Sequence, residues 1–234
     1  MAAWNEGRVV GQKQWNDKLF SIYVEADIED YEAGQFAKLG LQVGDEIIGR
    51  PYSLVNPPDR RPLEFYYIHV PDGPLTSALV KLQQGDRILV SPRANGFMIL
   101  DEVPQSRYLW LIATGTGVGP FLAILDTLKP WQRFEKVVLV YAVRSLSELS
   151  YQERIAGVQA RHPERFVYVP FISREASDFA MPGRIPDAIV DHRLETRAGL
   201  LLNAEDTQVM MCGNPQMVED TMRVLVERGF KKHR

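Results

Sequence analysis

The run Leu109–Leu125 (LWLIATGTGVGPFLAIL) constrains the fold more than any other part of the chain. It predicts a buried strand, then the glycine-rich turn Gly115–Pro120, then an apolar helix. A strand that passes through such a turn into a helix presents backbone N–H groups to a phosphate, and glycines let the backbone approach it closely. The pattern departs from G-x-G-x-x-G because Pro120 stands at the third glycine position. Alone, it fits either a dinucleotide site or a βα turn without a ligand.

Composition limits the kinds of protein that the chain can be. A chain of 234 residues with 45% hydrophobic content can bury a core and has room for two modest domains. Its 27 basic and 30 acidic residues give a net charge of -3, which excludes a strongly basic nucleic-acid binder. No apolar run reaches the length of about 18 residues that a membrane-spanning helix needs. The N-terminus also lacks the basic and apolar segments of a signal peptide.

Cysteine and histidine usage gives further limits. The single cysteine, Cys212, cannot form an internal disulfide or hold an iron–sulfur cluster. The four histidines lie apart, without the spacing of a zinc site. We therefore expect a cytoplasmic protein with no bound metal, no membrane contact and no nucleic-acid partner.

The first part of the chain, from Trp4 to about Ser91, has the pattern of short strands separated by turns. Their close spacing predicts an antiparallel barrel or sandwich, which we place in a first domain of residues 1–98. A single helix is predicted at Pro74–Leu82, after the turn residues Asp72-Gly73. The strand-like runs are Leu19–Val24, Gln35–Leu41, Ile47–Val55, Leu63–Val70 and Arg87–Ser91.

From Tyr108 onward, strand-like and helix-like runs alternate. This order predicts a parallel sheet with helices on both faces, in a second domain of residues 106–234. The predicted strands are Tyr108–Ala113, Lys136–Val143, Phe166–Ile172 and Gln208–Met211. The predicted helices are Val118–Leu128, Ser150–Arg161, Pro186–His192 and Pro215–Arg228. The fold class is thus β followed by α/β, and ligands of such sheets bind at the carboxyl ends of the strands.

The segment Arg50-Pro51-Tyr52-Ser53 ends a strand-like run in the first domain. An arginine there offers a forked cation to a phosphate. Tyr52 points to the same face two residues later, where its ring can stack on a planar ligand, and Ser53 adds a small hydroxyl. Alone, the segment is more typical of a surface arginine beside a half-buried tyrosine.

The segment Cys212-Gly213-Asn214-Pro215 follows the last predicted strand. Gly213 and Asn214 permit an unusual turn, and Pro215 suits the first turn of a helix. This places a second strand end beside the glycine-rich turn. The alternative is an ordinary strand-to-helix turn with a buried cysteine.

Together and in this order, R-P-Y-S, G-T-G-V-G-P and C-G-N-P resemble the motifs of the ferredoxin–NADP reductase family, and most of all those of its bacterial ferredoxin/flavodoxin–NADP reductases. Ala33–Phe36 before the first motif and Glu64–Tyr67 after it match as well, so the resemblance covers nearly the whole chain. It implies an antiparallel FAD-binding barrel followed by an NADP-binding α/β domain with a parallel sheet.

The resemblance also assigns contacts with the cofactors. It implies Arg50 on the FAD pyrophosphate, Tyr52 stacked on the isoalloxazine ring and Ser53 near flavin N5. Further FAD contacts are implied for Pro51, Tyr66, Tyr67, Ile68, His69, Pro74, Leu75, Thr76 and Thr116. Contacts with the nicotinamide nucleotide are implied for Gly115, Gly117, Val143, Met210, Met211, Cys212, Gly213 and Asn214. Ser53 and Cys212 would lie at the reacting atoms, Cys212 as a packing residue rather than a nucleophile.

Preference for NADP over NAD requires cations that meet the 2′-phosphate. Arg144 follows one strand-like run, and Ser173-Arg174 follow another, so both lie at the carboxyl edge of the predicted sheet. Arg184, after Gly183, matches the family pattern and is the third candidate. Each charge-assisted hydrogen bond contributes roughly 1.5–3 kcal/mol.

The implied activity is that of an enzyme, a ferredoxin/flavodoxin–NADP reductase. NADPH would pass hydride to flavin N5, and the FAD would pass single electrons to ferredoxin or flavodoxin, the transient partner of a monomer. Two alternatives stay open. One is an NAD(P)H-dependent reductase that serves free flavin, a quinone or an oxygenase component. The other is a subunit that senses FAD or another nucleotide without turnover.

Overall fold

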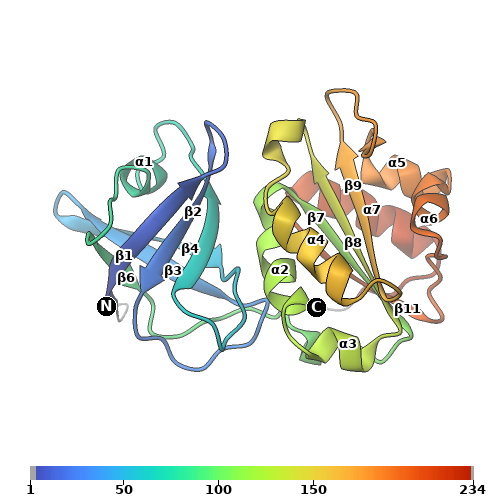
Figure 1. Cartoon of the computed structure of the whole chain (residues 1–234), viewed down its shortest axis with the longest axis horizontal. Coiled ribbons are helices and arrows are strands. Elements are labelled where there is room, and N and C mark those ends of the chain that lie inside the picture. Colours follow the sequence, from blue (N-terminus) through green and yellow to red (C-terminus); the bar gives the residue numbers. More distant parts are fainter. Residues whose placement is uncertain (1–3, 233–234) are drawn as a thin grey trace. The chain divides into compact units, whose positions relative to one another are not determined.

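The computed structural model describes residues 4–232, which form two compact units (Figure 1). Of the described residues, the first unit comprises 4–99 with Gly119–Thr127, and the second comprises Leu100–Val118 with 128–232. Part of the N-terminal segment that argued against a signal peptide, residues 1–3, lies outside the described residues. Within residues 4–232, no helix has the length and apolar character needed to cross a membrane. The same residues contain no cluster of side chains suited to a metal ion.

The first unit contains a six-stranded antiparallel sheet in the order β4-β3-β6-β1-β2-β5. A bridge between Leu54, just after β4, and Phe65 in β5 joins the two edges and closes the barrel. Apolar side chains on alternate positions fill its interior, among them Ile22, Leu39 and Leu63. The strands are β1 (Asn5–Gln14), β2 (Leu19–Glu25), β3 (Phe36–Val43), β4 (Glu46–Ser53), β5 (Leu63–Ile68) and β6 (Arg87–Val90).

Two features of this unit differ from the sequence prediction. The sequence did not predict β1, because its residues do not alternate regularly between apolar and polar and only Gly7 and Val9 are buried. Pairing with β2 and β6 stabilises it instead. The helix predicted at Pro74–Leu82 is shorter, since α1 spans only Thr76–Leu79 and the residues around it form turns.

The second unit contains a five-stranded parallel sheet in the order β10-β9-β8-β7-β11. Strand β7 lies between β8 and β11, so the chain order reverses on either side of it. Open parallel sheets bind ligands at the carboxyl ends of the strands beside such a reversal. The strands are β7 (Tyr108–Thr114), β8 (Lys136–Val143), β9 (Phe166–Ile172), β10 (Met181–Pro182) and β11 (Thr207–Cys212).

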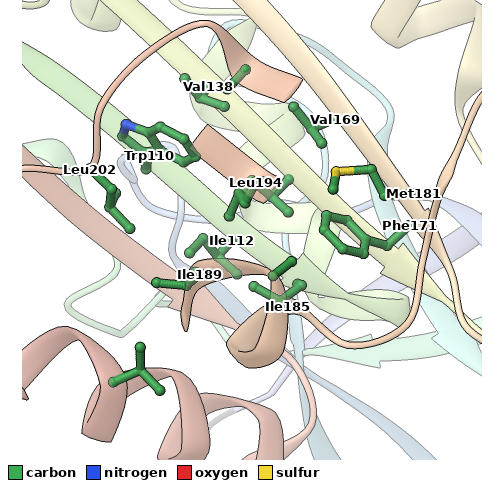
Figure 2. Close-up of a cluster of buried hydrophobic side chains, with 14 of the residues drawn as sticks. Trp110, Ile112, Val138, Val169, Phe171, Met181, Ile185, Ile189, Leu194 and Leu202 are labelled. Atoms are coloured by element: carbon green, nitrogen blue, oxygen red, sulfur yellow. The ribbon is translucent and has the colours of Figure 1, made fainter. Parts of the chain in front are cut away.

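Helices α5 (Ile185–Val190), α6 (Arg193–Ala198) and α7 (Pro215–Glu227) bury one face of this sheet. Figure 2 shows Ile185, Ile189 and Leu194 beside the strand residues Trp110, Ile112 and Phe171. Helices α3 (Lys129–Arg133) and α4 (Gln152–Arg161) pack against β8 and β9, and Figure 1 shows α4 on the other side of the strands from α7. The predicted fold class, an antiparallel barrel followed by a parallel α/β sheet, is confirmed.

Several helices begin or end at residues other than those predicted. The predicted helix Val118–Leu128 is a 3-10 turn, Gly115–Val118, followed by α2 (Gly119–Leu125), and the separate α3 comes next. The predicted helix Pro186–His192 is α5, and α6 after it was missed because His192 adopts a left-handed conformation that separates the two.

The far end of α7 is fixed by a buried ion pair. Arg228 Nη1 lies 2.8 Å from Glu195 Oε2, and the Leu202 amide donates to Glu195 Oε1 at 2.9 Å. Burial alone would raise the pKa of Glu195, but hydrogen bonds from Arg228, Leu202 and His192 outweigh it and lower that pKa. The carboxylate therefore stays charged at neutral pH and ties α7 to α6.

Candidate functional site

The R-P-Y-S segment ends β4, where Tyr52 and Ser53 are paired with Ala37 and Phe36 of β3. The Tyr52 ring meets the Tyr67 ring edge-on, with 6.2 Å between centroids and 75° between planes. Burial raises the pKa of the Tyr52 hydroxyl, although the Arg50 charge opposes this. The ring is half-buried, so its orientation is fixed while part of its surface remains available to a planar ligand.

Arg50 is exposed on the same strand. Its Nη1 donates to the Gly49 carbonyl oxygen at 2.9 Å, and it makes no ion pair within residues 4–232. A guanidinium without an acidic partner is suited to an external phosphate. Pro51, between Arg50 and Tyr52, is exposed as well.

Strand β5 supports Tyr52 from inside the barrel. Tyr67 is buried, stacks on Phe20 at 5.7 Å, and donates its hydroxyl hydrogen to Gln12 Oε1 at 2.7 Å. Tyr66 is buried too and meets Trp15 edge-on. Only the end of this segment has accessible side chains, since Ile68 is exposed and His69 is half-buried.

The turn that begins α1 has two unpaired backbone amides. The Thr76 hydroxyl both accepts from the Val70 amide and donates to the Val70 carbonyl at 3.2 Å, and the Ser77 amide donates to Gly73 at 3.0 Å. The amides of Leu75 and Thr76 have no partner in the described part of the chain. Adjacent unpaired N–H groups suit a phosphate, and the contacts expected at Pro74, Leu75 and Thr76 stay a prediction.

Ser53 lies beside the start of α2, which groups with the first unit. A Cβ added at Gly119 would lie 4.0 Å from the Ser53 Cβ and 3.4 Å from Val55 Cγ2. The Ser53 hydroxyl is half-buried and makes no hydrogen bond with any described residue. It is therefore available to a ligand that lies along the end of β4.

The two turns at the carboxyl ends of β7 and β11 are in direct backbone contact. A Cβ added at Gly117 would lie 2.4 Å from the Cys212 carbonyl oxygen, so only glycine allows this approach. Gly213, at φ +138°, is packed as closely against Thr114, whose Oγ1 accepts from the Asn214 amide at 2.8 Å. The structure thus brings together two motifs that the sequence separates widely.

The other predicted residues of these turns differ in their contacts and their burial. Asn214 caps α7, because its Oδ1 accepts from the amides of Gln216 at 2.9 Å and Met217 at 3.3 Å. Burial raises the pKa of the Cys212 thiol, which keeps it neutral and suits a packing role. Met210 is buried, whereas Met211 and Thr116 are half-buried.

Arg144 and Arg174 lie next to each other beyond the ends of β8 and β9. The Arg174 amide donates to the Arg144 carbonyl at 2.9 Å, and the Ser173 amide donates to the Val143 carbonyl at 3.1 Å. Both arginine side chains are exposed and make no ion pair among residues 4–232. Two arginines on paired backbones, both without an acidic partner among the described residues, suit a phosphate dianion.

Arg184 is placed differently. It caps α5, and its Nη2 forms an ion pair with Asp220 Oδ2 on α7 at 3.1 Å. Asp220 also accepts from Gln216 Nε2 at 3.0 Å and is mostly buried. No contact of the described residues joins Arg184 to Arg144 or Arg174, so a part in phosphate binding would require it to share or leave Asp220.

Comparison with known proteins assigns the chain to a family. A model described as "Oxidoreductase NAD-binding domain" matches residues 111–223. A flavodoxin/ferredoxin–NADP reductase of Escherichia coli (strain K12) is 44% identical over 221 residues, which are 94% of this chain and 89% of that protein. The chain belongs to the flavodoxin/ferredoxin–NADP reductase family. This confirms the resemblance inferred from the three motifs.

Other members of the flavodoxin/ferredoxin–NADP reductase family agree. The ferredoxin–NADP reductase of Pseudomonas aeruginosa is 37% identical over 96% of this chain and 90% of that protein. The crystal structure of a ferredoxin NADP+ reductase from Neisseria gonorrhoeae with bound FAD and NADP superposes with a TM-score of 0.93 and 34% identity. It covers 100% of this chain and 95% of that one.

Three residues of this reductase site were missed by sequence reasoning. Thr114 fixes the Asn214 turn, and Glu148 and Glu175 bond the loop amides beside Arg144. A hydroxyl directly before the glycine-rich turn was a usable signal for Thr114. The two glutamates had no such signal, because their partners are backbone amides.

Proposed function

We propose that this chain is an FAD-containing oxidoreductase that transfers electrons between NADPH and a one-electron carrier, ferredoxin or flavodoxin. One observation carries the proposal: the chain is 44% identical, over 94% of its length, to a flavodoxin/ferredoxin–NADP reductase. The local geometry supports it in each unit separately.

The first unit fits FAD. Arg50 has no acidic partner among the described residues, and the amides of Leu75 and Thr76 are unpaired, so a pyrophosphate has donors at two places. Tyr52 orients the ring system through the accessible part of its half-buried ring, and the unpaired Ser53 hydroxyl can donate to a ring nitrogen. The remaining contacts, at Pro51, Tyr66, Tyr67, Ile68, His69, Pro74 and Thr116, are proposed on the family pattern.

The second unit fits NADP. The close approach of Gly117 to Cys212 leaves backbone rather than side chains at the sheet edge, beside Gly115, Gly213 and Asn214. Met210, Met211, Val143 and Ser173 line the neighbouring strand ends, and Cys212 excludes water there as a neutral thiol. Arg144 and Arg174, with Arg184, bind the 2′-phosphate.

The chemistry itself belongs to the cofactors. FAD supplies the conversion between a two-electron hydride exchange at N5 and single-electron steps. The chain binds and orients, so it needs no nucleophile. We further propose that residues 1–98 bind FAD and residues 106–234 bind NADP, in a cytoplasmic monomer that meets its electron carrier transiently.

Anaerobic reduction of the flavin by NADPH and by NADH, followed by absorbance, tests this function. NADPH should bleach the flavin band faster than NADH, and reduced protein should pass electrons to ferredoxin or flavodoxin. A protein that holds FAD whose absorbance neither coenzyme bleaches would contradict the proposal that the chain is an enzyme.

The identity of the flavin is a separate prediction. Because the turn at Leu75-Thr76 offers unpaired amides in addition to Arg50, we expect FAD rather than FMN. Heat release and mass measurement of the cofactor identify it. Recovery of FMN, or failure to reconstitute any flavin, would overturn the assignment.

Tyr52 and Ser53 should have separable effects. Tyr52→Ala removes a stacking contact of about 0.5–1.5 kcal/mol beyond area burial, so flavin retention should fall by about two- to thirteenfold. Ser53→Ala should slow flavin reduction more than it weakens NADPH binding. Stopped-flow reduction and flavin titration check both, with Tyr52→Phe as the control that keeps the ring. Unchanged kinetics and retention in both variants would remove these residues from the site.

A further inference from the structure

The loop after β8 is held by carboxylates that the proposed chemistry does not use. The Arg144 amide donates to Glu148 Oε2 at 2.9 Å, and the Leu146 amide donates to Glu175 Oε1. The Tyr141 hydroxyl adds a contact to the Glu148 carbonyl at 3.3 Å. Glu148 lies in the same loop, whereas Glu175 comes from the loop after β9 and therefore joins two loops.

The Glu175 contact extends the pairing of the two strands beyond the sheet. The Ser173 amide bonds Val143, and the Arg174 amide bonds Arg144, so the backbones stay paired for two residues after the strands end. Glu175 continues this pairing with its side chain. Its carboxylate accepts from the amide of Leu146, two residues after Arg144. Arg144 and Arg174 lie in the middle of this series of contacts.

Glu175 places a negative charge close to the two arginines that are proposed to bind the 2′-phosphate. A carboxylate near a phosphate site repels the phosphate, so the charge of Glu175 opposes phosphate binding at Arg144 and Arg174. Neither Arg144 nor Arg174 forms an ion pair with Glu148 or Glu175 in the described part of the chain. The Glu175 oxygen is instead used by a backbone amide.

We propose that Glu175 is a positioning residue for 2′-phosphate recognition. Its carboxylate fixes residues 144–148 against residues 173–175. The backbones of Arg144 and Arg174 are therefore already held together, and the two arginines lose less conformational entropy when they bind the phosphate. This inference rests on the proposed function, because it takes the two arginines as the 2′-phosphate site.

The test compares Glu175→Ala with Glu175→Gln in the FAD-loaded protein. The glutamine keeps an oxygen that accepts from the Leu146 amide but carries no charge. Three quantities are measured: calorimetric binding of adenosine 2′-monophosphate, KM for NADPH and NADH, and hydrogen exchange of the Leu146 amide. The control is Glu164→Ala, because Glu164 is an exposed glutamate just before β9, at the amino end of the strand rather than its carboxyl end.

Glu175→Ala should weaken adenosine 2′-monophosphate binding by about three- to tenfold, the size of one net hydrogen bond. Its KM for NADPH should rise by the same factor, KM for NADH and kcat should stay constant, and the Leu146 amide should exchange faster. Glu175→Gln keeps an acceptor but makes a weaker hydrogen bond, and it also removes the charge that repels the phosphate. These two effects oppose each other, so binding should stay within about twofold of wild type.

Two results would overturn the inference while leaving the function intact. Tighter binding in both variants would show that Glu175 acts only as a repelling charge. Faster exchange in Glu175→Ala without weaker binding would show a purely structural contact. If wild-type protein binds adenosine 2′-monophosphate no better than adenosine 5′-monophosphate, the NADP assignment itself fails, and this inference fails with it.

Discussion

Replacing both Arg144 and Arg174 with alanine is expected to lower kcat/KM for NADPH by about a hundredfold while that for NADH barely changes. Two charge-assisted hydrogen bonds are worth at most about 3–6 kcal/mol, and the exposure of both side chains places the effect at the low end. The loss should appear in KM, because the phosphate is remote from the hydride and is bound alike in ground and transition states.

Ionic strength and a control variant make this prediction specific. The gap between wild type and the double variant should narrow at high salt, because exposed ion pairs are screened. Arg161→Ala, an exposed arginine at the end of α4, should leave both coenzymes unaffected. Steady-state kinetics with NADPH and NADH decide the matter. Equal losses of kcat/KM with both coenzymes, or a wild type that prefers NADH, would show that the two arginines do not recognise the 2′-phosphate.

The sequence predicts the second unit better than the first, for a physical reason. Buried parallel strands such as β7 and β8 are nearly continuous apolar runs, which stand out locally. Strand β1 has one polar side exposed to solvent and is stabilised by its two neighbours, so local pattern does not reveal it. The short α6 depends on the left-handed turn at His192, which composition does not indicate.

For the site as well, the sequence indicates residues that have a local signal and misses contacts between distant segments. Motif residues such as Tyr52 and Gly117 were predicted because each carries a local signal. Contacts between distant segments were not, since the Arg184–Asp220 ion pair and the Leu146–Glu175 bond exist only once the strands are paired. A residue predicted for the site can thus have a partner within the chain that the sequence did not indicate, as Arg184 has in Asp220.

Replacing Gly117 with alanine should have the second-largest effect. The added Cβ would lie 2.4 Å from the Cys212 carbonyl oxygen, 2.6 Å from its carbon and 2.7 Å from Gly213 Cα. All three neighbours are backbone atoms, so the two turns must move apart. We expect a loss of about 1–3 kcal/mol in the free energy of unfolding. Displacement of the turn by about 1 Å should slow flavin reduction by NADPH by up to about 100-fold.

Two glycines in the same unit separate this clash from other causes. Gly199→Ala, after α6, meets open space but has φ +62°, so it should cost about 1–2 kcal/mol of backbone strain outside the two turns. Gly157→Ala in α4 would place its Cβ 3.5 Å from Arg161 Nη1, an ordinary contact, and should stabilise by about 0.5–1 kcal/mol. Denaturant unfolding and stopped-flow reduction are measured for all three. Gly199→Ala can match the stability loss of Gly117→Ala without touching either turn. Only Gly117→Ala should therefore lose more reduction rate than its loss of stability explains. Equal rates in these two variants would mean that the contact between the turns is structural and does not position the nicotinamide nucleotide.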